Sequence, residues 1–206
     1  YEAGLFYMRD PAEARGRLIG LAVRHAPQVI GDGVRSIAEL IIADPRLCPL
    51  MAHYTTVLPA GRLDHIPPQG ERVILSTVAS LRVGGRYENA MRLNTPHLED
   101  SVDAIARSMD GFHFGRLDVR FSSEDALRQG QFQIIEGNGA GSEAIQFWDP
   151  TLGLAQAYLG VCRKQALLFQ LADIMRANGA VPVSIPTLAR AWWRQLKLMK
   201  AYPPSN

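Results

Sequence analysis

Hydrophobic and polar positions alternate most regularly in residues 114–121 (FGRLDVRF). A period of two places successive side chains on opposite faces of a β-strand. The hydrophobic face carries Leu117, Val119 and Phe121, and the polar face carries Arg116, Asp118 and Arg120. This pattern predicts a strand that buries one face in a core and presents charges on the other.

A second alternating run covers residues 132–138 (FQIIEGN), where Phe132, Ile134, Glu136 and Asn138 share one face. The residues between the two runs are polar and end at Gly130, which predicts a hairpin turn. If the two strands pair, Asp118, Glu136 and Asn138 converge at one end of the hairpin. The alternative is a purely structural polar hairpin, in which Asp118 forms an ion pair with a neighbouring arginine.

The rest of the chain predicts strands at residues 1–9, 16–23 and 71–75, and a possible short helix at residues 50–57. Ser36 and Glu39 form a capping box that starts a helix, and Thr95 caps another that ends near residue 110. A long helix is expected over residues 152–178, stopped by Gly179. Its buried side is expected to carry Tyr158, Val161, Leu168 and Met175.

The last helix is expected over residues 187–200, followed by a tail at residues 202–206 that should fray. It has an apolar stripe and a basic stripe. The apolar stripe consists of Trp192, Leu196 and Met199, and the basic stripe consists of Arg190, Arg194 and Lys197. Such a helix either docks on its own domain or lies on a membrane surface. We therefore divide the chain into a domain at residues 1–186 and a terminal helix and tail at residues 187–206.

Composition narrows the class of protein. The chain has 206 residues, 47% hydrophobic and 20% charged, which is typical of a globular protein. A net charge of +2 gives no electrostatic reason to expect nucleic acid as the partner. Cys48 and Cys162 lack metal or redox spacing and are expected to be buried thiols in a reducing, cytoplasmic compartment. No apolar run reaches the length of a membrane span.

The two alternating runs carry candidate chemistry. Carboxylate and amide oxygens from Asp118, Glu136 and Asn138 suit Mg²⁺, which prefers oxygen ligands. Arg116 lies on the same face, where its guanidinium can hold an anion. The NGAGS loop that follows, residues 138–142, can bring backbone N–H groups close to a ligand.

Four segments together resemble the ATP-grasp family of carboxylate–amine ligases. They are residues 31–33 (GDG), 116–118 (RLD), 136–139 (EGNG) and 148–150 (WDP). The second and third are similar to stretches of the D-alanine–D-alanine ligase branch, and the first resembles a loop of the cyanophycin synthetases. The resemblance implies an α+β fold: the C-terminal subdomain of an ATP-grasp enzyme, a mostly antiparallel sheet flanked by helices.

By this resemblance, Asp118, Glu136 and Asn138 hold Mg²⁺ or Mn²⁺, and Glu136 also contacts ATP. Arg116 holds the transferring phosphoryl group, and Ser142 binds the acceptor or an oxyanion. After its asparagine the chain reads NGAGSE, where the D-alanine–D-alanine ligase branch has proline and glycine, so the acceptor cannot be carried over.

Two further residues are candidates for binding ATP, each with an alternative that stays open. Glu2 opens a strand, where the family often binds ribose hydroxyls; an edge carboxylate facing water is the alternative. Arg82 and Arg86 flank a Gly-Gly pair, and Arg82 is our candidate for binding a γ-phosphate or a substrate carboxylate. Solvent-facing charge is the alternative there.

The function implied is ATP- and Mg-dependent ligation of a carboxylate to an amine through an acyl phosphate. Its partners are small-molecule substrates, and the phosphate-binding lysines of the family would lie upstream of Tyr1. The chain is therefore expected to be a C-terminal portion that is inactive alone. The alternative function is a non-catalytic binding or interaction domain of the same fold.

Overall fold

The computed structural model describes residues 1–202, which form two compact units, Tyr1–Leu168 and a second unit from Phe169 onward. The predicted boundary after residue 186 stays a prediction. The strands are β1 (Glu2–Met8), β2 (Arg17–His25), β3 (Gln28–Ile30), β4 (Arg72–Ile74), β5 (Arg86–Asn89), β6 (Phe114–Arg120) and β7 (Gln133–Asn138). The α-helices are α1 (Ile37–Ala43), α2 (Met51–Val57), α3 (Pro96–Ser108), α4 (Glu124–Arg128), α5 (Leu154–Ala177) and α6 (Ile185–Ala201). Short 3₁₀ turns are η1 (Cys48–Leu50), η2 (Leu81–Val83), η3 (Met91–Leu93) and η4 (Ile145–Trp148).

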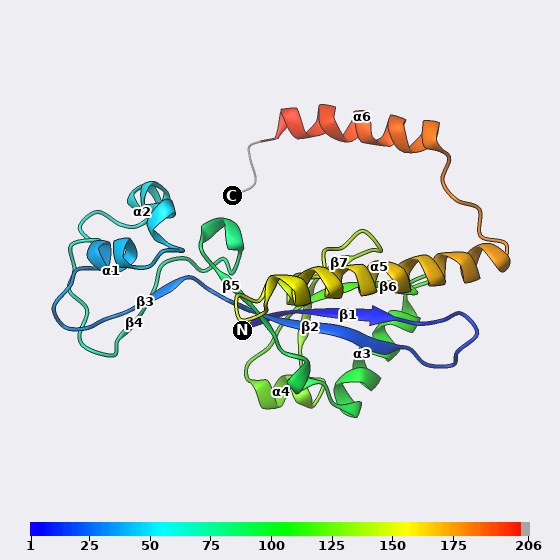
Figure 1. Cartoon of the computed structure of the whole chain (residues 1–206), viewed down its shortest axis with the longest axis horizontal. Coiled ribbons are helices and arrows are strands. Elements are labelled where there is room, and N and C mark those ends of the chain that lie inside the picture. Colours follow the sequence, from blue (N-terminus) through cyan, green and yellow to red (C-terminus); the bar gives the residue numbers. More distant parts are fainter. Residues whose placement is uncertain (203–206) are drawn as a thin grey trace. The chain divides into compact units, whose positions relative to one another are not determined.

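A five-stranded antiparallel sheet in the order β5-β2-β1-β6-β7 forms the centre of the first unit (Figure 1). Strands β3 and β4 form a separate two-stranded sheet beside α1 and α2. The second sheet has its own core, in which Ile37, Ile41 and Tyr54 are fully buried.

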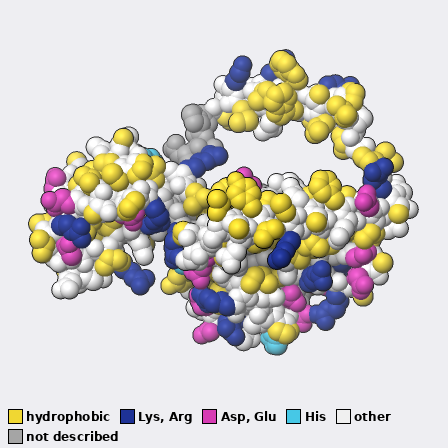
Figure 2. Space-filling view, in the orientation of Figure 1, with side chains coloured by type: hydrophobic (Ala, Val, Ile, Leu, Met, Phe, Trp, Pro, Cys, Tyr) yellow, Lys and Arg dark blue, Asp and Glu magenta, His cyan; other side chains and the backbone are white. Residues whose placement is uncertain are grey.

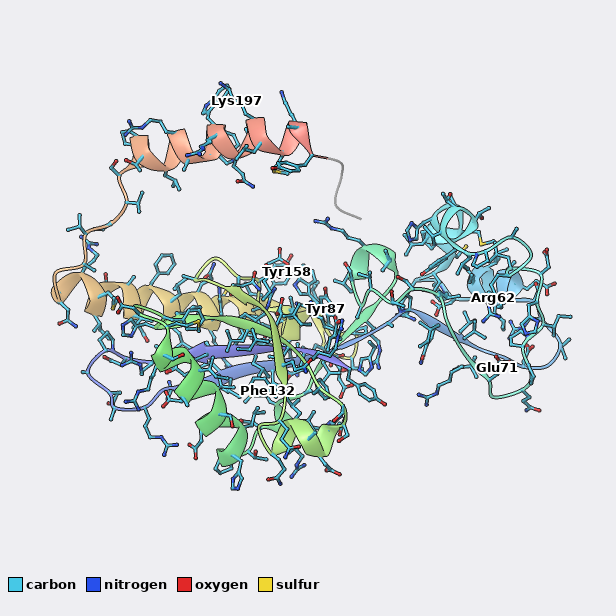
Figure 3. All side chains as sticks on the ribbon, turned by 180° about the vertical axis from the view of Figure 1, so that it is seen from behind. Arg62, Glu71, Tyr87, Phe132, Tyr158 and Lys197 are labelled. Atoms are coloured by element: carbon cyan, nitrogen blue, oxygen red, sulfur yellow. The ribbon has the colours of Figure 1, made fainter. Side chains whose placement is uncertain are left out.

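One face of the large sheet is an apolar core covered by α3 and α4. Leu117, Val119 and Phe121 are buried there, as their alternation predicts. Leu98 and Val102 of α3 and Leu127 of α4 pack in the same cluster, and Phe132, labelled in Figure 3, packs against it. The other face carries the polar side chains and is partly covered by η4, where Ile145 packs beside Phe6.

Most helix boundaries follow the predicted caps. Ser36 forms the capping box with Glu39, Thr95 caps α3 with Pro96 in its first turn, and Gly179 follows α5 with a φ of 91°. The final helix begins two residues earlier than predicted, because Ser184 caps it and Pro186 occupies its first turn. Residues 203–206 of the predicted frayed tail lie outside the described residues.

Three predictions about local structure were wrong. The hairpin turn contains the short helix α4, because Ser123 accepts a hydrogen bond from the N–H of Ala126 and so caps it. Cys48 and Cys162 are exposed rather than buried. On α5, Tyr158 and Val161 are exposed, and Gly160, Lys164 and Leu171 are the buried positions instead.

A buried polar contact ties α3 to the sheet. Tyr7 Oη donates to Oδ1 of Asp103 at 2.6 Å, and the N–H of Gly16 donates to the same oxygen at 2.8 Å. Burial, and then the hydrogen bond to Asp103, raise the pKa of Tyr7 far above its usual range. Burial alone would raise the pKa of Asp103, but the hydrogen bonds from Tyr7 and Gly16 outweigh it and lower that pKa.

We predict that Asp103→Ala lowers the free energy of unfolding by about 1–3 kcal/mol, because it leaves two donors near the core without an acceptor. Urea unfolding at pH 7 measures the loss. Asp100→Ala is the matched control, since Asp100 is an exposed residue of the same helix whose side chain pairs only with exposed Arg15. An equal loss of unfolding free energy in both variants would show that the buried contacts of Asp103 do not stabilise the fold.

The stability difference between wild type and Asp103→Ala should also depend on pH. Because folding lowers the pKa of Asp103, its contribution is complete above the unfolded-state pKa of about 3.9 and is lost as pH falls through the lower folded-state value. The difference in unfolding free energy between wild type and Asp103→Ala should therefore shrink below about pH 4. A difference that grows on acidification would refute this origin.

Candidate functional site

The carboxylate of Asp118 is the centre of the polar face. It is buried, and two arginines hold it. Arg24 Nη2 donates to Oδ2 at 2.7 Å, while Arg116 donates through Nε to Oδ1 at 2.6 Å and through Nη2 to Oδ2 at 3.1 Å. Asn138 Nδ2 adds a contact to Oδ2 at 3.2 Å. The two-point contact with Arg116 fixes the carboxylate plane, because a guanidinium matches both oxygens.

Small residues on the central strands make room for this cluster. Gly4 lies directly opposite Asp118 in the pairing of β1 with β6. A Cβ at Gly4 would lie 2.9 Å from Cδ of Arg116 and 3.0 Å from Cδ1 of Ile145. Phe6, the next residue on this face, lies beneath the Arg116 guanidinium at 5.6 Å from its ring centroid. The Arg116 side chain therefore follows a path that β1 leaves open.

The edge strand β7 brings the other two predicted metal ligands to the same face. Asp118 pairs directly with Glu136, and Arg116 pairs directly with Asn138. A register shift follows at once, because Val119 pairs with Ile134 and leaves Ile135 as an extra residue. The predicted alternation along residues 132–138 is thus broken between Ile134 and Glu136. Asn138 contacts Asp118, Glu136 lies opposite Asp118 in the register, and the metal-binding role of the three stays a prediction.

The cluster fits a divalent cation in the kind of donors it offers. Glu136 is exposed and makes no ion pair or side-chain hydrogen bond with the residues described, so both its oxygens are available. The oxygens of Asp118 are shared with two arginines. Within residues 1–202 no group of three or more His, Cys, Asp or Glu side chains is placed to hold a metal ion. A metal site here would have to use two carboxylates and the Asn138 amide, which are oxygen ligands of the kind that Mg²⁺ prefers.

A cleft of about 640 Å³ lies at the end of the sheet, between β1, β2 and β6 on one side and β3 and β4 on the other. Its lining includes three arginines, Arg24, Arg72 and Arg120, together with Glu2 and His25. Its size is that of a small-molecule site. Arg24 lines this cleft and also contacts Asp118, so it connects the cleft to the cluster. Tyr87 of β5, labelled in Figure 3, lies under the Arg24 guanidinium at 5.8 Å.

Glu2 therefore lies in the cleft, where it accepts a hydrogen bond from Arg120 at 2.8 Å. Arg82 lies elsewhere. It is an exposed residue of η2 and is not among the residues that line the cleft. The structure thus brings Glu2, Asp118, Glu136, Asn138 and Arg116 to one face of the sheet, with Glu2 at the end next to the cleft and Arg116 and Asn138 further along the strands, but it does not bring Arg82 there.

The glycine loop after β7 is fixed by a buried lysine. Lys164 of α5 donates to the carbonyl oxygens of Ser142 at 3.0 Å and Ala140 at 3.4 Å, and its ammonium lies 5.3 Å from the ring centroid of Phe114. Burial, and then the positive charge of Arg116, lower the pKa of Lys164. Ser142 Oγ is buried and has no hydrogen-bond partner among the described residues.

The other two motifs serve local structure. Asp32 accepts the backbone N–H groups of Val34 and Arg35, and Gly33 has a φ of 74°, so the GDG loop is a tight turn into α1. Asp149 is buried and accepts the N–H of Asn89 at 2.8 Å, which ties η4 to β5. Burial alone would raise the pKa of Asp149, but hydrogen bonds from Thr151 and Asn89 lower it overall.

Sequence reasoning missed Arg24 and Lys164. Nothing local marks Arg24, because its partner lies two strands away. Lys164 did have a signal: the chain has 22 basic residues, and it is the sole lysine before residue 197. Arginine supplies surface charge nearly everywhere else, so a lone lysine in an apolar helix pattern indicates a special environment.

The comparisons with known proteins bear on the fold. No protein-family model matches the chain, and no curated protein matches its sequence. Among solved structures it is similar to a bifunctional glutathione synthetase from Pasteurella multocida, with a TM-score of 0.55 and 18% sequence identity. The match covers 82% of this chain and 23% of that chain. The α+β fold, with its five-stranded antiparallel sheet flanked by helices, thus resembles part of that synthetase structure, and the predicted fold class is confirmed.

We predict that Asp118→Ala costs about 3–5 kcal/mol of unfolding free energy, because it leaves Arg24 and Arg116 side by side without their carboxylate. Urea unfolding measures this loss. Asp64→Ala, at an exposed aspartate, should stay within about 0.5 kcal/mol of wild type. A cost for Asp118→Ala as small as that of the control would show that the cluster contributes nothing to the fold.

For Lys164 the pH effect has the same sign as for Asp103, because folding lowers both pKa values, but it falls in the alkaline range. Folding lowers its pKa, so the buried charge weakens the fold until the amine loses its proton. Wild type should gain stability relative to Lys164→Met as pH rises from the lowered folded-state pKa towards about 10.4. Thermal unfolding of both proteins between pH 7 and 10 tests this, and a falling difference would refute it.

Proposed function

We propose that this chain supplies the metal-binding and phosphoryl-binding part of an ATP- and Mg-dependent carboxylate–amine ligase. The chain spans 23% of the length of the enzyme that it matches, so a ligase would need further segments. The observation that carries the proposal is the placement of Asp118, Glu136 and Asn138 on one face of the sheet, beside an arginine-lined cleft.

Asp118, Glu136 and Asn138 would hold Mg²⁺ or Mn²⁺, with Glu136 as the ligand that has no competing partner. When bound, such an ion neutralises phosphate charge during phosphoryl transfer. Glu136 is then also a contact for ATP through the ion. Asp118 already contacts two arginines, so a bound metal ion and the two guanidinium groups would share its carboxylate. The carboxylate would then hold the ion at a fixed distance from both guanidinium groups.

Arg116 would stabilise the transferring phosphoryl group. Its guanidinium is already fixed by Asp118 and by the carbonyl oxygen of Glu143 at 2.9 Å, so little reorganisation is needed at the moment of reaction. The reaction proposed has two steps. A carboxylate oxygen attacks the γ-phosphorus and releases ADP, and an amine then displaces phosphate from the acyl phosphate.

The remaining predicted residues take supporting roles in this proposal. Glu2 lies in the cleft, where a nucleotide ribose would meet its carboxylate. Arg82 stays a prediction for phosphate or carboxylate binding, made from the sequence alone. The Ser142 hydroxyl, buried and without a partner among the described residues, is a donor for the acceptor or for an oxyanion, on a loop that Lys164 fixes.

A second candidate function is a non-catalytic binding domain of the same fold. The saturation of Asp118 by Arg24 and Arg116 favours it, because a carboxylate held by two arginines is also a structural ion pair. The two candidates differ in Glu136. A structural network has no use for this exposed carboxylate, whereas metal-dependent chemistry needs it.

Glu136→Gln is therefore the most informative variant, since it removes charge from an exposed side chain without disturbing a contact. In the full-length natural protein we expect ADP release with Mg²⁺, supplied carboxylates and amines to fall by about a hundredfold or more. Glu13→Gln makes the same change at an exposed loop residue and should retain wild-type turnover.

Mn²⁺ binding, followed by electron paramagnetic resonance in the presence of ATP, separates the two candidates. We expect Glu136→Gln to weaken Mn²⁺ binding by about 10- to 100-fold. Turnover and Mn²⁺ affinity at wild-type levels in Glu136→Gln would reject the metal assignment. Mn²⁺-ATP binding by wild type, with no ADP formed from any substrate pair, would favour the binding domain.

A further inference from the structure

The C-terminal part of the chain has an unusual distribution of charge. Residues 174–206 contain five arginines and lysines and no aspartate or glutamate, although the chain as a whole carries only +2. Four of the five lie on α6, which Ser184 caps and which has Pro186 in its first turn. Lys197 marks this helix in Figure 3, and in Figure 2 yellow and dark-blue side chains follow it without magenta ones.

The two kinds of side chain lie on different sides of α6. At 100° per residue, the spacings of four and seven place Leu188 on the same stripe as Trp192 and Met199, together with the half-buried Leu196. The side chains of Leu188, Trp192 and Met199 are 60–62% exposed. Arg190, Arg194 and Lys197 share the opposite side. The apolar stripe is thus uncovered, and the basic side has no acidic residue of its own helix as a partner.

Trp193 lies at the border between the two sides. With Ala189, Arg190, Arg194 and Lys197 it lines a shallow hollow of about 480 Å³ on α6. Indole rings favour the boundary between apolar and polar media, and three cations around one hollow suit a phosphate group. The same helix therefore offers an apolar stripe, a boundary tryptophan and a group of three cations. These match, in that order, the acyl region, the interface and the phosphate groups of a bilayer surface.

Other occupants fit less well. A nucleic acid would pair with the cations but leave Trp192 and Met199 in water. A second copy packed through the apolar stripe would bring two basic helices together with no acidic side chain on either. No helix within residues 1–202 is long and apolar enough to span a membrane.

We propose that α6 binds in the plane of membranes that contain anionic phospholipid, with its apolar stripe in the acyl boundary and its basic side among the headgroups. This role is independent of the proposed ligase chemistry. The structure assigns Trp192 to the stripe that would enter the acyl boundary of the membrane, and Trp193 to the headgroup boundary. It assigns Arg190, Arg194 and Lys197 to phosphate contacts.

The test uses the full chain with vesicles of phosphatidylcholine alone or mixed with phosphatidylglycerol. We expect co-flotation with the mixed vesicles only, weakened by salt. Trp148→Phe leaves Trp192 and Trp193 as the reporting indoles, and their emission should shift to the blue on binding. Each basic residue near an anionic surface contributes a factor of about five, so Arg190→Gln with Arg194→Gln should weaken binding about 25-fold.

Matched controls separate this from a general charge or apolar effect. Arg62→Gln with Arg128→Gln removes the same charge from exposed positions of the first unit and should leave binding unchanged; Arg62 is labelled in Figure 3. Trp192→Ala should weaken binding to mixed vesicles, whereas Trp148→Ala, at a residue 56% exposed, should not.

Several results would overturn the proposal. They are no flotation at low salt, equal flotation with neutral vesicles, and binding that the two glutamines on α6 do not alter. Concentration-dependent dimerisation that Trp192→Ala abolishes, without vesicle binding, would assign the stripe to a second copy. Retention on DNA without vesicle binding would assign the basic side to nucleic acid.

Discussion

The carboxylate of Asp118 lies between the guanidinium groups of Arg24 and Arg116, and the polar face of the sheet is arranged around this contact. Arg116 comes from the same strand, but Arg24 reaches from β2, across β1. The contact therefore spans the three central strands of the sheet. Removing two cations and an anion from water is costly, and the hydrogen bonds among the three groups offset much of that cost, although Nε of Arg24 is buried without a partner among the described residues.

Because of this contact, the two faces of the large sheet have different roles. The apolar face, packed on α3 and α4, stabilises the fold by burying hydrocarbon. The polar face can then hold charges in fixed positions, as a site for phosphate and metal requires. The edge strand β7 completes it, because the register shift at Ile135 sets Glu136 and Asn138 on the side of Asp118.

Much of the fold could be predicted from local signals. Capping residues fixed the starts of α1 and α3, and alternation located β6 and its buried face. Helix α4 was missed because a five-residue helix has too little periodicity to detect. The buried side of α5 was misjudged because Lys164, a charged residue, occupies it.

The site was predictable only in part. The pairing of Asp118, Glu136 and Asn138 follows from two adjacent strands, and the alternative that pairs Asp118 with a neighbouring arginine is seen with Arg116, but no pattern indicates that Arg24 also holds the carboxylate. That fact depends on tertiary contacts between segments far apart in sequence.

Gly4 has a consequence for how such a chain can change over evolutionary time. The space where its side chain would be is the space that Cδ of Arg116 and Cδ1 of Ile145 occupy. A mutation that adds even one methyl group at position 4 meets both side chains, so a shorter residue at position 116 alone does not make room for it. Positions 4, 116 and 145 should therefore vary together, although 112 and 141 positions separate Gly4 from the other two along the chain.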